Sequence, residues 1–509
     1  MPKIHVCVLW HMHQPFYKDL VSGEYKLPWT RLHALKDYRG MVRVLEDFPE
    51  VHQTFNVVPS MMVQVEEYAE GRASDPFLNC ALKASDTLSE EEQAFILRYF
   101  FQADPARMIA RYPRYAELHD IWRTADRNVV RARRRFGVQA FRDLQVLSQL
   151  VWFDEDSLSG DAEVRELALK GRGYSPEDQS LLGRKQGEFL ATVLPAYKEF
   201  AARGQIEIST TPFYHPILPL VCDSDIARVS HPGVPLPGRF QYPQDARLQL
   251  VRARQYMLEK FGCEPAGLWP SEGSVSDEVL GLASELGFRW AATDNGVLAR
   301  TLGVAAGAAE TYKPYVWRRE GREIRMVFRD HFLSDLVGFV YSRMGEAEAA
   351  SDLLGRIHDN CRPILAAGRD ALVPIILDGE NAWEYYEKNG RPFLRELYRR
   401  ISLDPDILAL TVSEALERTE PAPLGHIFPA SWISTNFDIW IGHTEDNQAW
   451  EYLLAARRAY ERLTASHEGA GLSPENRALA LEELLIAEGS DWCWWYGPHH
   501  DSANRPEFD

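Results

Sequence analysis

Short, almost entirely apolar runs recur along the chain, and longer segments with helical periodicity separate them. An apolar run of this kind is typical of a strand that is buried on both faces. The alternation of such strands with helices predicts an α/β fold with a parallel sheet. The predicted strands are Ile4–Leu9, Gln53–Val58, Ile206–Ser209, Ala266–Leu268, Trp290–Ala292, Ile324–Phe328 and Leu372–Leu377.

A polar residue lies at or just after the end of each predicted strand. In barrels of parallel strands, active sites are built from residues at the carboxyl ends of the strands. We therefore expect the functional site at this edge of the sheet. The residues concerned are His11, Asn56, Thr210, Glu272, Asp294, Arg329 and Asp378.

Two regions depart from the alternation of strands and helices. Residues from about 62 to 203 have helical periodicity with few strand signals, which predicts a helical insertion between two strands. Residues after 391 are again mostly helical. We expect residues 1–391 to form the catalytic domain and residues 392–509 to form a helical domain that contributes to the cleft.

Composition and charge narrow the possible partners of the chain. It has 509 residues, 45% of them hydrophobic, and a formal net charge of −18, which excludes nucleic acid and anionic membranes as main partners. No apolar run reaches the roughly 18 residues that span a bilayer. The chain begins with a predicted buried strand instead of a signal peptide. The six scattered cysteines, none in a CxxC pair, predict reduced thiols and a cytoplasmic protein.

Aromatic residues are abundant, with 14 Trp, 21 Tyr and 23 Phe. Their rings build cores, but they also stack on the apolar faces of sugars. A neutral carbohydrate substrate therefore fits both the charge and the composition. The sequence does not indicate an oligomeric state.

The segment His11-Met12-His13 ends the first predicted strand. Residues two apart on a strand share a face, so both imidazoles can meet one ligand. They can hydrogen-bond a sugar hydroxyl, support the structure or bind a metal, although zinc needs at least a third protein ligand. A second motif, GQIEISTTPFYHPILPL, adds Glu207 and His215 as candidates for the lining of the cleft.

Two further motifs carry carboxylates at strand ends. In GLWPSEG, Glu272 follows Trp269 and either acts as a nucleophile or caps the next helix. In LDGENAWEYY, Asp378 and Glu380 lie two residues apart, and Trp383 follows them. Like charges at this spacing raise the pKa of at least one carboxyl, as a general acid requires, although a structural or calcium-binding role is the alternative.

The C-terminal region adds indoles to the candidate site. The segments FPASWI and EGSDWCWWYG are rich in Trp and either line a sugar cleft or attach the C-terminal helices to the sheet. The candidate substrate-binding residues here are Trp432, Trp440, Trp492 and Trp494.

As a set, these motifs closely resemble glycoside hydrolase family 57, in its α-amylase and amylopullulanase branch. The matching segments are HMHQPFYKDL, GQIEISTTPFYHPILPL, GLWPSEG, ATDNGVL, LDGENAWEYY, FPASWI and EGSDWCWWYG, which extend from near residue 11 to residue 497. The resemblance implies an incomplete (β/α)7 barrel followed by a helical domain.

The resemblance also implies a retaining enzyme on α-1,4-glucans that needs no metal or organic cofactor. Glu272 takes the family position of the nucleophile, and Asp378 takes that of the acid/base. His11, His13, Glu207, Trp269 and Glu380 match family positions around the cleaved bond. Asp294 also follows a predicted strand and is the competing candidate for the acid.

Several alternatives remain open at the level of sequence. Hydrolysis is the first expectation, 4-α-glucanotransferase the second and branching the third, since all share the same double displacement. A metal-dependent polysaccharide deacetylase or mannosidase-like hydrolase would use His11 and His13, but no third ligand is evident. A non-catalytic glucan-binding protein is disfavoured because both Glu272 and Asp378 are intact.

Overall fold

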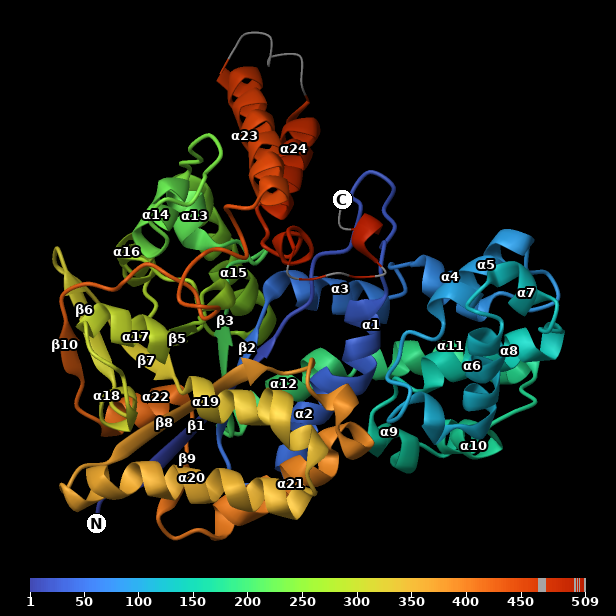
Figure 1. Ribbon diagram of the computed structural model, residues 1–509, viewed down its shortest axis with the longest axis horizontal. Helices are drawn as coiled ribbons and strands as arrows, with labels where there is room; N and C mark the ends of the chain where they lie inside the picture. Colours follow the sequence, from blue (N-terminus) through green and yellow to red (C-terminus); the bar gives the residue numbers. More distant parts are fainter. Residues whose placement is uncertain (466–472, 499, 501, 503, 508–509) are drawn as a thin grey trace.

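The computed structural model describes residues 1–465, 473–498, 500, 502 and 504–507. Within them, one ten-stranded sheet has the order β10-β6-β7-β5-β4-β3-β2-β1-β8, and β9 pairs with β1 (Figure 1). The strands are β1 (Ile4–Met12), β2 (Gln53–Val57), β3 (Ile206–Thr210), β4 (Gly267–Leu268), β5 (Trp290–Asp294), β6 (Tyr315–Arg319), β7 (Arg322–Arg329), β8 (Ala371–Asp378), β9 (Ile407–Ala409) and β10 (Ala422–Leu424).

All seven predicted strands are present, and they form one parallel series from β7 through β5, β4, β3, β2 and β1 to β8. The two outer members of this series approach each other. The backbone N–H of Asp330 donates to the carbonyl of Pro374 at 2.9 Å, and the guanidinium of Arg329 donates to the carbonyl of Ile376 at 2.7 Å. The sheet therefore curls until β7 and β8 meet.

Three strands were not predicted: β6, β9 and β10. Strand β6 pairs antiparallel with β7 and leaves Arg318 and Arg319 exposed, so it lacks the continuous apolar pattern. Strands β9 and β10 have three residues each, which is too short for a periodic signal. Whether such short segments form strands depends on pairing with their neighbours in the fold, because their own sequence carries no strand pattern.

Helices fill the predicted insertion between β2 and β3. They are α3 (Pro59–Ala69), α4 (Pro76–Leu82), α5 (Glu90–Tyr99), α6 (Pro113–Thr124), α7 (Val129–Arg133), α8 (Val138–Leu150), α9 (Glu155–Gly160), α10 (Ala162–Lys170), α11 (Pro176–Leu190) and α12 (Val193–Ala202). Those from α4 to α11 form a lobe beside the sheet (Figure 1).

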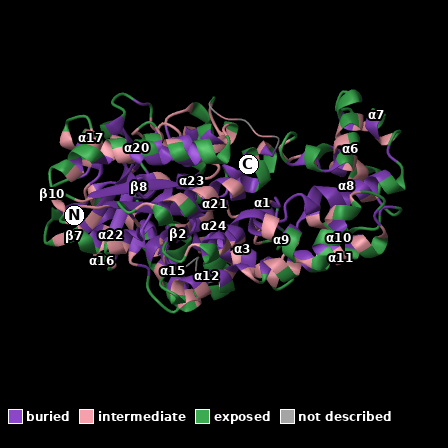
Figure 2. Cartoon of the chain, turned by 90° about the horizontal axis from the view of Figure 1, so that it is seen from below, coloured by how far each residue is buried: buried purple, intermediate pink, exposed green. Residues whose placement is uncertain are grey.

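Further helices lie between the later strands in the chain and pack around the sheet, and others come after the last strand. Main examples are α15 (Pro243–Phe261), α16 (Asp277–Glu285), α17 (Asn295–Leu302), α20 (Glu346–Ala366), α21 (Arg391–Leu403) and α22 (Val412–Arg418). The long helices α23 (Thr444–Ala465) and α24 (Pro474–Ala487) project together from the body of the molecule (Figure 1). The strands enclosed by the helices are buried (Figure 2).

The end of β8 lies unusually close to β1. The backbone N–H of Gly379 donates to the carbonyl of His11 at 2.8 Å. A Cβ on Gly379 would lie 2.2 Å from the sulfur of Met12, so any other residue here would force the Met12 side chain to move. This contact fixes the carboxyl end of β8 beside the His11-Met12-His13 segment.

None of the helices described is both long and apolar enough to cross a membrane. All six cysteines are free thiols, and five of them are buried.

Candidate active site

The sheet register brings the predicted strand-end residues together. His11 on β1 lies opposite Asn56 on β2 and opposite Asp378 on β8. Because β1 stands between β2 and β8, these three side chains form one row at the carboxyl edge of the sheet. The site thus forms where the alternation of strands and polar ends predicted it.

Glu272 is held by a tight turn directly after β4. Its backbone has φ 58° and ψ 26°, a left-handed conformation that is costly for a residue with a side chain. Two hydrogen bonds from Trp432 hold it there. The backbone N–H of Trp432 donates to the Glu272 carbonyl at 2.9 Å, and the indole N–H donates to a carboxylate oxygen at 2.7 Å. Backbone strain of this kind concentrates at functional sites.

Asp378 is the last residue of β8 and is only partly buried. One of its carboxylate oxygens accepts a hydrogen bond from the side-chain amide of Asn381 at 2.7 Å. The chain turns sharply at Gly379, directly after the strand, and this brings the side chain of Asn381 within hydrogen-bond distance of Asp378. The acidic end of the strand is therefore positioned by its own loop.

Glu272 and Asp378 interact electrostatically. Burial raises the pKa of Glu272 to about 7, the charge of Asp378 adds to this rise, and the indole of Trp432 opposes it. Burial also raises the pKa of Asp378, against the hydrogen bond from Asn381 and the charges of His13 and Arg329. The two carboxyls therefore lose their protons in separate steps and hold one proton between them over an intermediate pH range.

Glu380 is a third carboxyl at this edge, and it is 1% exposed. One oxygen accepts from the backbone N–H of His13 at 3.0 Å, and the other has no hydrogen-bond partner among the described residues. Burial raises its pKa well above the usual range, and Asp378 and Asp37 add to the shift. The raised pKa favours the neutral form of Glu380, and its hydrogen bond with the backbone of His13 supports the His11–His13 segment.

Three imidazoles face the carboxyl pair: His11, His13 and His215. The rings of His13 and His215 stack at 3.8 Å between centroids, and His11 lies 5.3 Å from His215. His11 donates from Nδ1 to the carbonyl oxygen of Asn56 at 2.7 Å, because an amide oxygen can only accept. Burial lowers the pKa of His11 to about 3 and that of His215 well below its usual value, so both are neutral.

His215 is the third histidine that a metal reading of His11 and His13 required. One nitrogen from each ring lies within 4.8 Å of those of the other two. However, the planes of His13 and His215 are only 15° apart, and that of His11 is 21–24° from theirs. Nitrogen lone pairs lie in the ring plane, so rings stacked at 3.8 Å direct them in parallel instead of at one ion. The geometry favours hydrogen bonding over metal ligation.

His13 differs from the other two histidines because it contacts an acid. Its Nε2 lies 2.7 Å from a carboxylate oxygen of Asp491. Burial disfavours its protonated form, but Asp491, Glu272 and Asp378 outweigh burial and raise its pKa. Asp491 was not among the predicted site residues. It lies in the motif EGSDWCWWYG, whose indoles alone are among the predicted site residues, so its place in that motif is the signal that points to it.

Two predicted residues make their contacts elsewhere. Glu207 lies near the start of β3, where its carboxylate accepts from Ser413 and from the indole of Trp290 at 2.9 Å. Asp294 caps α17 and pairs with Arg329 at 3.1 Å, with both side chains buried. Hydrogen bonds and an ion pair within the protein therefore already engage both carboxylates.

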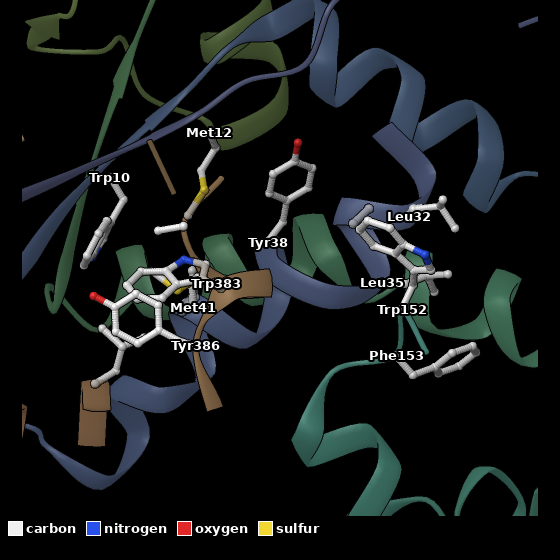
Figure 3. Close-up of a cluster of buried hydrophobic side chains, with 14 of the residues drawn as sticks. Trp10, Met12, Leu32, Leu35, Tyr38, Met41, Trp152, Phe153, Trp383 and Tyr386 are labelled. Atoms are coloured by element: carbon white, nitrogen blue, oxygen red, sulfur yellow. The ribbon is translucent and has the colours of Figure 1, made fainter. Parts of the chain in front are cut away.

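The candidate tryptophans divide into three groups. Trp269 is fully buried beneath the site and packs edge-on against Trp432, with centroids 5.2 Å apart. Trp383 and Trp440 are core residues: Trp383 packs among Trp10, Met41 and Tyr386 (Figure 3), and the carbonyl of Trp440 accepts from Trp450. Trp492 and Trp494 are partly exposed. Trp432 is thus the indole in direct contact with a candidate catalytic carboxyl.

Two carboxyls at the carboxyl ends of separate strands, with one proton between them, are the arrangement that retaining glycosidases use. The model of Glycosyl hydrolase family 57 matches residues 7–427. Because this match covers well over half of the chain, the chain belongs to that family. Asp491 lies beyond the matched residues.

Curated relatives are distant. An α-amylase from Pyrococcus furiosus is 24% identical over 258 residues, which are 48% of this chain and 34% of the relative. Alpha-amylase 1 from Dictyoglomus thermophilum is 28% identical over 98 residues, which are 19% of this chain and 11% of the relative. The aligned part of this chain thus spans about a third of the length of the Pyrococcus enzyme.

Solved structures share the fold over nearly the whole chain. The α-amylase AmyC from Thermotoga maritima has a TM-score of 0.60 at 12% identity, covering 100% of this chain and 91% of the other. A GH57-type branching enzyme from Pyrococcus horikoshii has a TM-score of 0.59 at 15% identity, covering 96% and 85%. At these identities, the likeness shows the mixed α/β fold with its mostly parallel sheet.

Proposed function

We propose that the protein is a retaining glycoside hydrolase that acts on α-1,4-glucans through a covalent glycosyl–enzyme. The observation that carries this proposal is the electrostatically coupled pair of Glu272 and Asp378 at the carboxyl edge of the sheet. Retention requires the two carboxyls about 5–5.5 Å apart. The effect of the Asp378 charge on the pKa of Glu272 supports such proximity, and the family and the amylase names of the relatives support the substrate.

The roles of the two carboxyls follow from their surroundings. Glu272 accepts the indole N–H of Trp432, which stabilises its ionised form and suits a nucleophile. Burial and the charge of Asp378 raise the pKa of Glu272 to about 7, so the shared proton rests on Glu272, and the reactive form is the one in which it has moved to Asp378. In that form Asp378 donates the proton to the glycosidic oxygen while Glu272 attacks the anomeric carbon. Asp378 then takes a proton from water, whose oxygen displaces Glu272 and restores the α configuration.

The remaining candidate residues surround this pair. We assign His11, His13 and His215 to hydrogen bonding with sugar hydroxyls, and Trp269 to supporting Trp432. Trp492 and Trp494 are assigned to more distant sugar units, since both are partly exposed. The scheme needs no metal or organic cofactor.

The finer architecture is part of the same proposal. The seven parallel strands, closed where β7 meets β8, form an incomplete (β/α)7 barrel within residues 1–391. The helices between β2 and β3 form an insertion, and residues 392–509 form a C-terminal domain that reaches the cleft. The hydrogen bonds between the β7 and β8 ends and the contact of Asp491 with His13 support this division.

Transfer to a second sugar uses the same carboxyl pair, so 4-α-glucanotransferase or branching activity is the alternative. One experiment separates the possibilities. The purified protein is incubated with maltopentaose and the products are resolved by length. Products that are only shorter than the substrate indicate hydrolysis, and longer products indicate transfer. No product from maltopentaose, starch or glycogen would overturn the proposal.

A further inference from the structure

The segment Glu488–Asp491, named here the C-terminal arm, reaches from the end of α24 into the candidate site. Gly489 pairs with Pro216 in an antiparallel bridge, and Ser490 donates two hydrogen bonds to the His215 carbonyl, at 3.1 Å from the backbone and 2.8 Å from the hydroxyl. A Cβ on Gly489 would lie 2.6 Å from the Tyr214 carbonyl oxygen, so the close approach requires glycine. The arm is thus fitted to the loop that carries His215.

The arm delivers one carboxylate to the row of histidines. Asp491 binds Nε2 of His13 at 2.7 Å, and the same oxygen lies 3.9 Å from Nδ1 of His215. Nδ1 of His215 hydrogen-bonds the hydroxyl of Ser490 at 3.0 Å instead, so His13 is the imidazole that hydrogen-bonds Asp491. The side chains of His13 and Asp491 are only 13% and 20% exposed, so the contact is poorly screened by water.

Of the three imidazoles, His13 is the one whose surroundings favour the protonated form. Three carboxyls favour its protonated form, whereas the neighbouring imidazoles are neutral. The titratable groups that face it are Glu272 after β4, Asp378 and Glu380 at the end of β8, Asp491 on the arm, His11 on β1, and His215 after β3.

We propose that Asp491 is a positioning residue that holds His13 as an imidazolium near Glu272 and Asp378, so that the C-terminal arm completes the reaction centre. The inference rests on the proposed glycosidase function. Throughout a double displacement, the carboxyl pair carries one net negative charge, first on Glu272 and then on Asp378. A fixed imidazolium beside both stabilises that charge wherever it stands.

Removing the charge of Asp491 has two opposite effects on the pKa of Glu272, one direct and one through His13. The charge of Asp491 itself raises the pKa of Glu272, and the charge of His13 lowers it by more. Asp491→Asn keeps the shape and an acceptor for His13, but it lets His13 lose its proton at lower pH. Near neutral pH, the substitution therefore removes the positive charge of His13 from beside Glu272 and Asp378. At acidic pH, His13 is protonated even without Asp491, so the substitution has little effect there.

The test combines a titration with kinetics. In protein labelled with 15N-histidine, the signal of His13, assigned through its loss in His13→Gln, is followed against pH. We expect wild-type His13 to stay protonated to higher pH than in Asp491→Asn. With maltopentaose, kcat/KM of Asp491→Asn should fall by about 10- to 100-fold at pH 7, the range for a lost charge-assisted hydrogen bond, and by less than about threefold at pH 5.

A matched control is Asp404→Asn. Asp404 binds Nε2 of His358 at the same 2.7 Å, but it follows α21 near the amino-terminal end of the sheet. This variant should leave both the titration of His13 and kcat/KM unchanged. In a His13→Gln background, Asp491→Asn should cause no further loss, because the two residues act as one unit.

An unchanged His13 titration in Asp491→Asn, or a full additional loss in the His13→Gln background, overturns the inference. The titration needs no turnover. If His13 responds to Asp491 as expected while the wild type leaves every glucan intact, the proposed function fails and the relationship between Asp491 and His13 stands.

Discussion

Trp432 binds Glu272 through both its backbone and its indole, although 160 residues separate the two in the chain. The indole donates to the carboxylate at 2.7 Å, packs edge-on against Trp269 and carries the guanidinium of Arg329 over its face at 5.1 Å. The nucleophile in the proposed mechanism is thus fixed by an aromatic residue that is itself fixed on two sides.

Removing the indole donor should impair the nucleophile. In Trp432→Phe the ionised form of Glu272 loses a hydrogen bond that lowers its pKa, so its pKa rises and the productive arrangement of the shared proton becomes rarer. We expect kcat to fall by about 10-fold or more with a smaller change in KM. Trp317→Phe is the control, since that indole, on β6 outside the parallel series, donates to Asp277 at 2.8 Å, and the substitution should leave kcat unchanged. Equal losses in both variants would contradict the prediction.

The carboxyl pair predicts a bell-shaped pH dependence. Activity requires one proton on the pair: with two, Glu272 cannot attack, and with none, Asp378 cannot donate. The two limits belong to the pair, whichever carboxyl holds the proton: the first proton leaves above pH 3.8, which sets the acid limit of kcat/KM, and the second leaves close to pH 7, which sets the alkaline limit. Initial rates on maltopentaose between pH 3 and pH 9 check this. A profile that is flat through pH 7 would count against the coupled pair.

Azide separates the roles of the two carboxyls. Asp378→Asn should lose about 10²–10⁴-fold on natural glucans but far less on a fluoride or nitrophenyl substrate, whose leaving group needs no proton. Azide should attack its accumulated intermediate and give the α-glycosyl azide. Glu272→Gly forms no intermediate, so azide should give the β-glycosyl azide directly. The anomeric configuration, read by NMR, decides between the assignments.

Asp294 is expected to matter for stability and not for proton transfer. Asp294→Asn breaks the buried ion pair with Arg329 and should lower the free energy of unfolding by about 3 kcal/mol. Asp245→Asn, which breaks the buried pair with Arg457 at 2.6 Å, is the comparison and should destabilise to a similar degree. Denaturant unfolding measures both. If Asp294→Asn gave the α-glycosyl azide while Asp378→Asn still cleaved starch, Asp294 would be the acid.

Chelation should leave the activity nearly unchanged. The stacked planes of His11, His13 and His215 do not direct their lone pairs at one point, so we expect them to bind substrate and not zinc. Activity is measured after dialysis against EDTA, with and without added zinc or calcium. A large loss that zinc or calcium restores would instead support a metal site.

The sequence by itself determined the strands and the placement of the carboxyl motifs. The strands of the parallel series could be predicted because both of their faces are largely buried, and this makes each run mostly apolar. Glu272 and Asp378 could be predicted for the same reason: a polar residue that ends a buried strand must lie at the carboxyl edge of the sheet. The side-chain contacts in this row then depend on register, such as His11 opposite Asp378.

Tertiary structure decided which of the other candidates reach that edge. Glu207 lies on a predicted strand, but its position near the start of β3 places it among protein donors. Trp383 follows the acidic motif, yet packing against Trp10 turns it into the core. Asp491 meets His13 across 478 residues of chain, and no local pattern encodes a contact of that range. Periodicity reports which face of an element is buried, whereas only the assembled fold sets what lies opposite that face.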